Sequence, residues 1–157
     1  MNLAAEAPLW LQLIFALLLV AAAAQDAWTL RISNLTCLAI LVAAIVAAIL
    51  AGPRFSVWQN AATFAILLAL GTPMFAAGRL GGGDVKLMAT CGAWFDVRSG
   101  ALMLVSILLA GGILALLVLA LKALGVGEEH RRRFRDSKAT GIPYGVAIAC
   151  GTLLVLR

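Results

Sequence analysis

The sequence has few charged residues and few side chains of the kinds that usually serve in catalysis or metal binding. Charged residues make up 12% of its 157 residues, with seven Asp and Glu, one His and three Cys. Hydrophobic residues make up 64%, and the mean hydropathy is +1.06. Since soluble domains contain roughly 45–50% apolar and about 25% charged residues, this composition excludes a water-soluble globule. It predicts a single membrane-embedded domain over residues 1–157.

The scarce cysteines and the lone histidine exclude several kinds of site. Cys37, Cys91 and Cys150 lie far apart in apolar segments and form no CxxC pair, so we expect buried, unpaired side chains rather than disulfides or zinc ligands. His130 lies in the basic stretch EEHRRRFRD, and the chain has no HExxH spacing. A serine or cysteine triad would lack a positioned base, and we expect no metal and no cofactor.

Apolar runs predict membrane-spanning helices, since a helix needs about 20 mainly apolar residues to cross a core roughly 30 Å thick. A shorter run, Val85–Phe95, is a candidate sixth span. If it crosses, nine of the twelve Lys and Arg residues lie in loops on one face, whereas without it they divide almost evenly. The positive-inside rule then predicts an all-α integral membrane protein with six transmembrane helices and both termini on the outer side. The five longer runs are Leu9–Ala24, Leu35–Ala51, Val57–Met74, Ala101–Leu121 and Ile142–Leu156.

The net charge of +5 is, on this interpretation, a topology signal and not a sign of nucleic-acid binding. The basic loop Arg131–Lys138 is expected to contact anionic lipid of the inner leaflet.

Two acidic residues differ from the other five. Asp26 directly follows the first apolar run, and Asp84 ends a triple glycine in RLGGGDVKLM. With six helices, both lie at helix ends on the cytosolic face, and acidic residues near membrane depth are functional candidates. Taken singly, Asp26 could be an interfacial turn residue paired with Arg31, and Asp84 an N-cap. The three glycines favour a role for Asp84 beyond capping a helix. They permit positive φ and let another backbone, such as an extended substrate, approach closely.

Two such aspartates can hydrolyse a peptide bond. Carboxylates in contact cannot both ionise cheaply, so they share a proton, and one acts as base on water while the other acts as acid. The residues alone do not say which aspartate is which.

The motif RLGGGDVKLM resembles the GxGD motif of intramembrane aspartyl proteases, with Gly81, Gly83 and Asp84 at the matching positions. Together with DAWTLRISN and GIPYGVAIA, in that order, it resembles the type IV prepilin peptidases, and among them the compact branch that serves Tad/Flp-type pili. Ser33 stands where many relatives have proline.

This resemblance implies an aspartyl endopeptidase that removes the leader peptide from prepilins at the cytosolic face of the bacterial cytoplasmic membrane. It implies catalytic roles for Asp26 and Asp84. Supporting roles fall on the other motif residues, namely Gly81, Gly82, Gly83, Lys86, Arg31, Asn34, Pro143, Tyr144 and Gly145.

Larger prepilin peptidases also methylate the new N-terminus and carry paired CxxC motifs in a cytosolic segment. Nothing similar precedes Asp26, so we expect no N-methyltransferase activity and no metal. The expected partners are a prepilin, through its leader and its apolar helix, and the lipid bilayer. No nucleic acid is expected, and the sequence does not give the oligomeric state.

Two other functions stay open. A small ion-coupled transporter could use Asp26 and Asp84, but acidic residues at mid-helix depth and an internal repeat would be expected. A non-catalytic pilus or secretion assembly protein would share small-residue packing patterns such as Gly111-Gly112. The peptidase is the favoured prediction.

Overall fold

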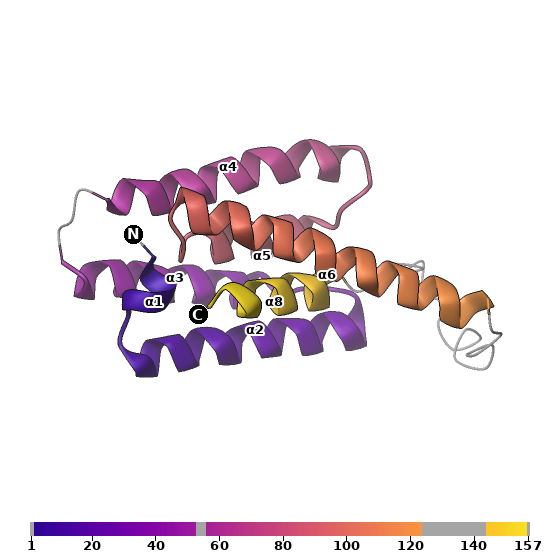
Figure 1. Cartoon of the computed structure of the whole chain (residues 1–157), viewed down its shortest axis with the longest axis horizontal. Coiled ribbons are helices and arrows are strands. Elements are labelled where there is room, and N and C mark those ends of the chain that lie inside the picture. The colour runs from indigo at the N-terminus through magenta and orange to yellow at the C-terminus, as the bar shows by residue number, and fades with distance from the viewer. Residues whose placement is uncertain (1, 53–55, 124–143, 157) are drawn as a thin grey trace.

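The structure, a computed structural model, describes residues 2–52, 56–123 and 144–156, and all regular secondary structure in these ranges is helical. A short helix precedes six longer ones (Figure 1). They are α1 (Leu3–Glu6), α2 (Leu9–Thr29), α3 (Asn34–Leu50), α4 (Val57–Ala76), α5 (Gly82–Gly92), α6 (Val97–Ala123) and α8 (Tyr144–Val155).

The longer helices lie side by side and alternate in direction, so most of their ends gather at two ends of a bundle, and α6 extends well beyond one of them (Figure 1). The short helix α1 and the end of α8 lie at one end, here called the terminal end. The α2–α3 and α4–α5 connections and the start of α8 lie at the other, here called the loop end. The most extensive helix contacts are α6 with α8, α4 with α5, and α2 with α8.

In the described part of the chain, three helices are long and apolar enough to cross a membrane, namely Leu9–Thr29, Val57–Ala76 and Val97–Leu121. The apolar helices α3 and α8 are shorter. With 11 residues, α5 is about 16 Å long at 1.5 Å per residue, or roughly half of the hydrocarbon core. Large apolar side chains, among them Leu17, Ile49 and Leu116, are exposed on the outside of the bundle, as expected for surfaces that face lipid.

Trp94 joins four helices at the terminal end. Its fully buried ring stacks on Phe15 of α2, with centroids 4.2 Å apart and planes 8° from parallel. Its Nε1–H donates to the carbonyl oxygen of Ile40 in α3 at 3.2 Å, and its own carbonyl accepts from the amide of Ala4 in α1 at 3.2 Å. The turn that follows α5 is therefore fixed inside the bundle.

The predicted apolar runs coincide with α2, α3, α4, α6 and α8, and Val85–Phe95 with α5 and the turn after it. One boundary changes the interpretation of Asp26, because α2 continues to Thr29 and Asp26 lies inside the helix. Cys37 and Cys91 are buried and free as expected. The expectation of burial is wrong for Cys150, which is exposed on α8.

The contact between α6 and α8 depends on Gly151, a residue that has no side chain. A Cβ atom at Gly151 would lie 2.6 Å from both the Cα and the amide nitrogen of Ile107. These are backbone atoms in the middle of a helix, so they cannot move aside alone. Gly151 lets the two helix backbones approach closely, as small residues do in membrane helix pairs.

We expect Gly151→Ala to destabilise the protein by about 1–3 kcal/mol, the usual cost of overpacking a close contact. Gly112→Ala is the matched control, since a Cβ at this other helical glycine meets nothing within 4 Å. Thermal unfolding of both variants in detergent micelles measures the difference. Equal unfolding temperatures for the two variants would contradict the close α6–α8 contact.

Candidate active site

Asp26 lies in the last turn of α2, with its side chain facing the bundle interior and only 5% of the residue exposed. Its Oδ2 accepts a hydrogen bond of 2.6 Å from the amide of Gly145, 119 residues further along the chain. A Cβ at position 145 would lie 2.8 Å from both Cβ and Oδ2 of Asp26. Glycine is therefore needed here for the two elements to meet. The first turn of α8 presents its amides, the positive end of the helix dipole, to this carboxylate.

The chain reverses direction directly after Asp26. Leu30 ends α2 in the left-handed region, at φ 50°, and its amide donates to the carbonyl oxygen of Asp26 at 2.9 Å. The side-chain oxygen Oε1 of Gln25 accepts from the Ser33 amide at 3.3 Å and from Thr36 Oγ1 at 3.1 Å. Ser33 in turn caps α3, with its hydroxyl accepting from the Leu35 amide at 3.1 Å. These bonds hold the loop beside Asp26.

Two simple interpretations of Asp26 are therefore wrong. It is not a residue of an interfacial turn, because it lies within α2 and is buried. Nor is it paired with Arg31, which is exposed in the loop, and no ion pair joins these two residues in the described part of the chain.

Asp84 lies in the first turn of α5 and is partly buried. Its Oδ2 accepts a hydrogen bond of 3.2 Å from the amide of Gly81. The N-cap of α5 is Gly81, so Asp84 occupies the third helical position and bonds back to the cap, as the acidic residue of a capping box does. The alternative in which Asp84 is itself only the N-cap is wrong.

The triple glycine lets another part of the chain come close to its backbone and does not form a left-handed turn. Among the described residues, the only glycines with positive φ are Gly52 and Gly78, so the expected positive φ within the run is wrong. A Cβ at Gly83, however, would lie 3.1 Å from Cβ of Ile32 and 3.5 Å from its backbone nitrogen and oxygen. The backbone that approaches the run is thus the chain's own loop after Asp26, and Gly83 lets that loop reach α5.

The second glycine of the run, Gly82, faces a side chain and not another backbone segment. A Cβ at Gly82 would lie 3.2 Å from the ring of Phe75, which is itself 54% exposed.

The two aspartates interact electrostatically. The negative charge of Asp26 acts on the carboxyl group of Asp84, which also accepts the hydrogen bond from the Gly81 amide. The carboxylates therefore lie close enough that the ionisation of one disfavours that of the other. This is the coupling that a proton-sharing pair requires.

Two further motif residues meet at the loop end. Nζ of Lys86 donates to Oδ1 of Asn34 at 2.9 Å, across the surface between α5 and the start of α3. The bond adds a second link, besides the Gly83–Ile32 contact, between the chain that follows Asp26 and the helix that carries Asp84.

A cavity of about 740 Å³ opens beside Asp84, between α4, α5, α6 and α8. Its wall is mostly apolar, with Leu70, Met88 and Leu108 among its residues, and Tyr144 lies on it too. Asp84 belongs to this wall, whereas Asp26 does not. The groove can hold an extended apolar ligand next to one of the two carboxylates.

Pro143, His130 and the basic loop Arg131–Lys138 lie outside the described residues. Within the described ranges, no three His, Cys, Asp or Glu residues gather in a way that could hold a metal ion. The sequence motif included Gly145 but gave no sign that its amide binds Asp26. Gln25 was missed altogether, although its place directly before Asp26 could have drawn attention to it.

Comparison with known proteins identifies one family. A sequence model described as the type IV leader peptidase family matches residues 13–124, a range that contains both aspartates and the triple glycine. No curated protein sequence and no solved structure matches the chain.

Proposed function

Since the chain belongs to the type IV leader peptidase family and is therefore a leader-peptidase-like protease, we propose that Asp26 and Asp84 are its catalytic pair and that it removes the leader peptide from Flp/Tad-type prepilins. The observation that carries this proposal is that the end of α2 and the start of α5, which hold the two aspartates, lie at the same end of the bundle, where Gly83 packs against Ile32 of the loop after Asp26. Each carboxylate also accepts a hydrogen bond from a backbone amide at the start of a helix. The donor is Gly145 for Asp26 and Gly81 for Asp84.

In this mechanism the ionised carboxylate removes a proton from water, and the water oxygen attacks the carbonyl carbon of the scissile peptide bond. The protonated carboxyl then gives its proton to the leaving amine nitrogen as the C–N bond breaks. The two groups titrate as a pair, so base and acid are not assigned to individual residues. The Gly145 and Gly81 amides keep both carboxylates oriented while the proton changes place.

The apolar groove beside Asp84 suits the substrate of such an enzyme. We assign the apolar helix of the prepilin to the wall formed by α4, α6 and α8, with the scissile bond next to Asp84. The small residues Gly111, Gly112 and Ala115 on this wall let a second helix come close. Tyr144 and Arg79 lie on the same wall and are available to contact the polar leader.

The proposed topology has six membrane segments: α2, α3, α4, α5, α6 and α8. The common location of α1 and the end of α8 supports it (Figure 1), as does the position of Arg31, Arg79 and Lys86 in or next to the connections of the loop end. The loop end would then face the cytosol of a bacterium, and the termini the outer side of its cytoplasmic membrane. In this topology α5 enters from the cytosolic side and ends inside the bundle at Trp94.

The same proposal includes no N-methyltransferase activity, since no paired CxxC motif precedes Asp26. An ion-coupled transporter is less well supported, because Asp26 lies in the last turn of α2 and Asp84 in the first turn of α5. Neither aspartate lies at the mid-helix depth that this alternative predicts.

Asp26→Asn and Asp84→Asn should each abolish leader removal, because Asn keeps the shape of Asp but cannot exchange a proton. The measurement is the size shift of a Flp-type prepilin that is co-expressed with wild type or variant and followed on a gel.

Equal membrane levels of the three proteins are the control for insertion. Continued cleavage by either variant would exclude the paired mechanism. Failure of the wild type as well would reject the chosen prepilin as the substrate.

Gly145→Ala should lower the cleavage rate by roughly 10²-fold, because the added methyl group displaces Asp26 and small shifts of a catalytic group have effects of this size. The rate is measured on the same prepilin with purified protein in micelles. Cys150→Ala, at an exposed position on the same helix, is the matched control and should cleave at the wild-type rate. A fully active Gly145→Ala variant would contradict the orienting role of this contact.

A further inference from the structure

The two helices that carry the aspartates are held in place through other helices. Among the described helices, α3 and α8 each pack against both α2 and α5, whereas α2 and α5 are not in extensive contact with each other. The position of Asp26 relative to Asp84 is therefore set through intermediate segments. Gly145 of α8 binds Asp26 directly. The start of α3 is the second such segment.

Gln25 attaches the start of α3 to the end of α2. It directly precedes Asp26, and its Oε1 accepts two hydrogen bonds, from the Ser33 amide at 3.3 Å and from Thr36 Oγ1 at 3.1 Å. Ser33 is the N-cap of α3, and Thr36 is buried in the first turn of that helix. A single side-chain oxygen on α2 thus receives a backbone donor and a side-chain donor from the beginning of the next helix.

The same segment is also attached to α5. Nζ of Lys86 donates to Oδ1 of Asn34 at 2.9 Å. A Cβ at Gly83 would lie 3.1 Å from Cβ of Ile32, so the loop before α3 lies directly against the α5 backbone. Residues 32–36 therefore connect the two helices that hold the aspartates, and we call this segment the α3 bridge.

The distance between two such carboxyl groups determines how well they work as a pair. They have to share one proton and to reach the same water molecule. A displacement of about 1 Å at a site of this kind is enough to lower a rate by roughly 10²-fold. A segment that fixes the two helices relative to each other therefore controls the rate of the chemical step without contact to the substrate.

We propose that Gln25 is a positioning residue, which holds Asp26 at a fixed distance from Asp84 through the α3 bridge. This inference rests on the proposed function, because it takes the two aspartates to act as a pair. Gln25 supplies a hydrogen-bond acceptor to the bridge and exchanges no proton in the reaction. Loss of this acceptor detaches the bridge from α2, so kcat falls while the KM for the prepilin stays the same.

The first test removes the acceptor and keeps the size of the side chain. Gln25→Met has a similar length but only a weak acceptor. We expect its kcat for leader removal, measured with purified full-length protein in micelles, to fall roughly tenfold, with KM within about twofold of the wild type. A wild-type kcat in Gln25→Met would overturn the proposal.

Two substitutions of Thr36 test the same bond from its other side. Thr36→Val keeps the shape and removes the hydroxyl donor, so its kcat should fall by a smaller factor than that of Gln25→Met. Thr36→Ser keeps the donor and should cleave at the wild-type rate. Equal kcat values for Thr36→Val and Thr36→Ser would contradict the role of this hydrogen bond.

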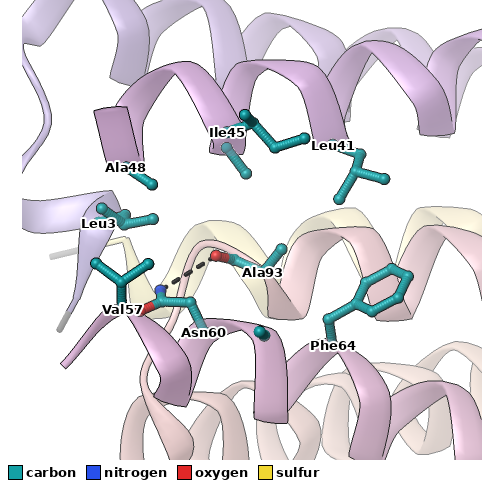
Figure 2. Close-up of a pocket in the computed structure, with 10 residues that line it drawn as sticks. Leu3, Leu41, Ile45, Ala48, Val57, Asn60, Phe64 and Ala93 are labelled. Atoms are coloured by element: carbon teal, nitrogen blue, oxygen red, sulfur yellow. Dashed lines mark hydrogen bonds between the residues drawn. The ribbon is translucent and has the colours of Figure 1, made fainter. Parts of the chain in front are cut away.

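Two controls separate the positioning role from a general loss of stability. Gln12→Met changes the same residue type on the same helix and removes hydrogen bonds to the carbonyl oxygens of Ala5 and Ala7 near the terminal end. Leu41→Ala loosens α3 further along, where Figure 2 shows Leu41 and Ile45 extending toward a cavity of about 220 Å³ between α3 and α4. Both should lower the unfolding temperature and keep the wild-type kcat. A tenfold lower kcat in either control would overturn the proposal.

Hydrogen–deuterium exchange tests the α3 bridge without any substrate. Measured by mass spectrometry on the full-length protein in micelles, exchange in Gln25→Met should be faster in residues 30–36 and at the start of α5, and unchanged around Trp94. Equal exchange in wild type and variant would overturn the bridge. Failure of the proposed function shows differently, as a wild type that cleaves no prepilin, and the exchange result then still decides whether Gln25 attaches α3 to α2.

Discussion

The hydrogen bond between the Gly145 amide and the Asp26 carboxylate is the constraint on which the loop end of the bundle depends. It fixes the start of α8 against the last turn of α2 at 2.6 Å, a distance that no residue with a side chain would permit. Once α8 is fixed there, its other face packs along α6 with Gly151 against the Ile107 backbone. The wall of the groove beside Asp84, which includes Tyr144 and Ile148 of α8, follows from this placement.

A bilayer offers little hydrophobic gain from bringing helices together, because lipid chains are as apolar as the side chains they replace. The bundle relies instead on close backbone contacts and a few directed hydrogen bonds. Gly83 against Ile32 and Lys86 against Asn34 join the loop after Asp26 to α5. At the terminal end, Trp94 joins the turn after α5 to three other helices. Its ring contacts α2, its indole N–H binds α3, and its carbonyl oxygen binds α1.

The sequence predicted the positions of the helices and placed both aspartates near helix ends, because long apolar runs and the residues that border them are strong signals in a membrane chain. It did not predict which face of each helix is inward. All faces are apolar, so Cys150 was expected to be buried although it is exposed. Contacts between segments that are distant in the sequence could not be predicted either. The residues around Gly145 do not indicate a hydrogen bond to a residue 119 positions earlier.

The position of Asp84 shows a second limit of prediction from the sequence, which concerns where a helix begins. A residue that follows three glycines is expected to cap the helix that it precedes, yet α5 begins two residues earlier, at Gly82, with Gly81 as its cap. Gly82 and Gly83 belong to the helix and lie close to Phe75 and Ile32. Tertiary contacts therefore decided a boundary that local propensity assigns differently.

The bond between Asp26 and Gly145 also has a consequence for the order of events during biosynthesis. The ribosome makes α2 early, and the amide that binds its carboxylate arrives with α8, after α3, α4, α5 and α6 have been made. Until then, the carboxylate in the last turn of α2 lacks this donor. The hydrogen bond between α2 and α8 can therefore form only after every other described helix has been made.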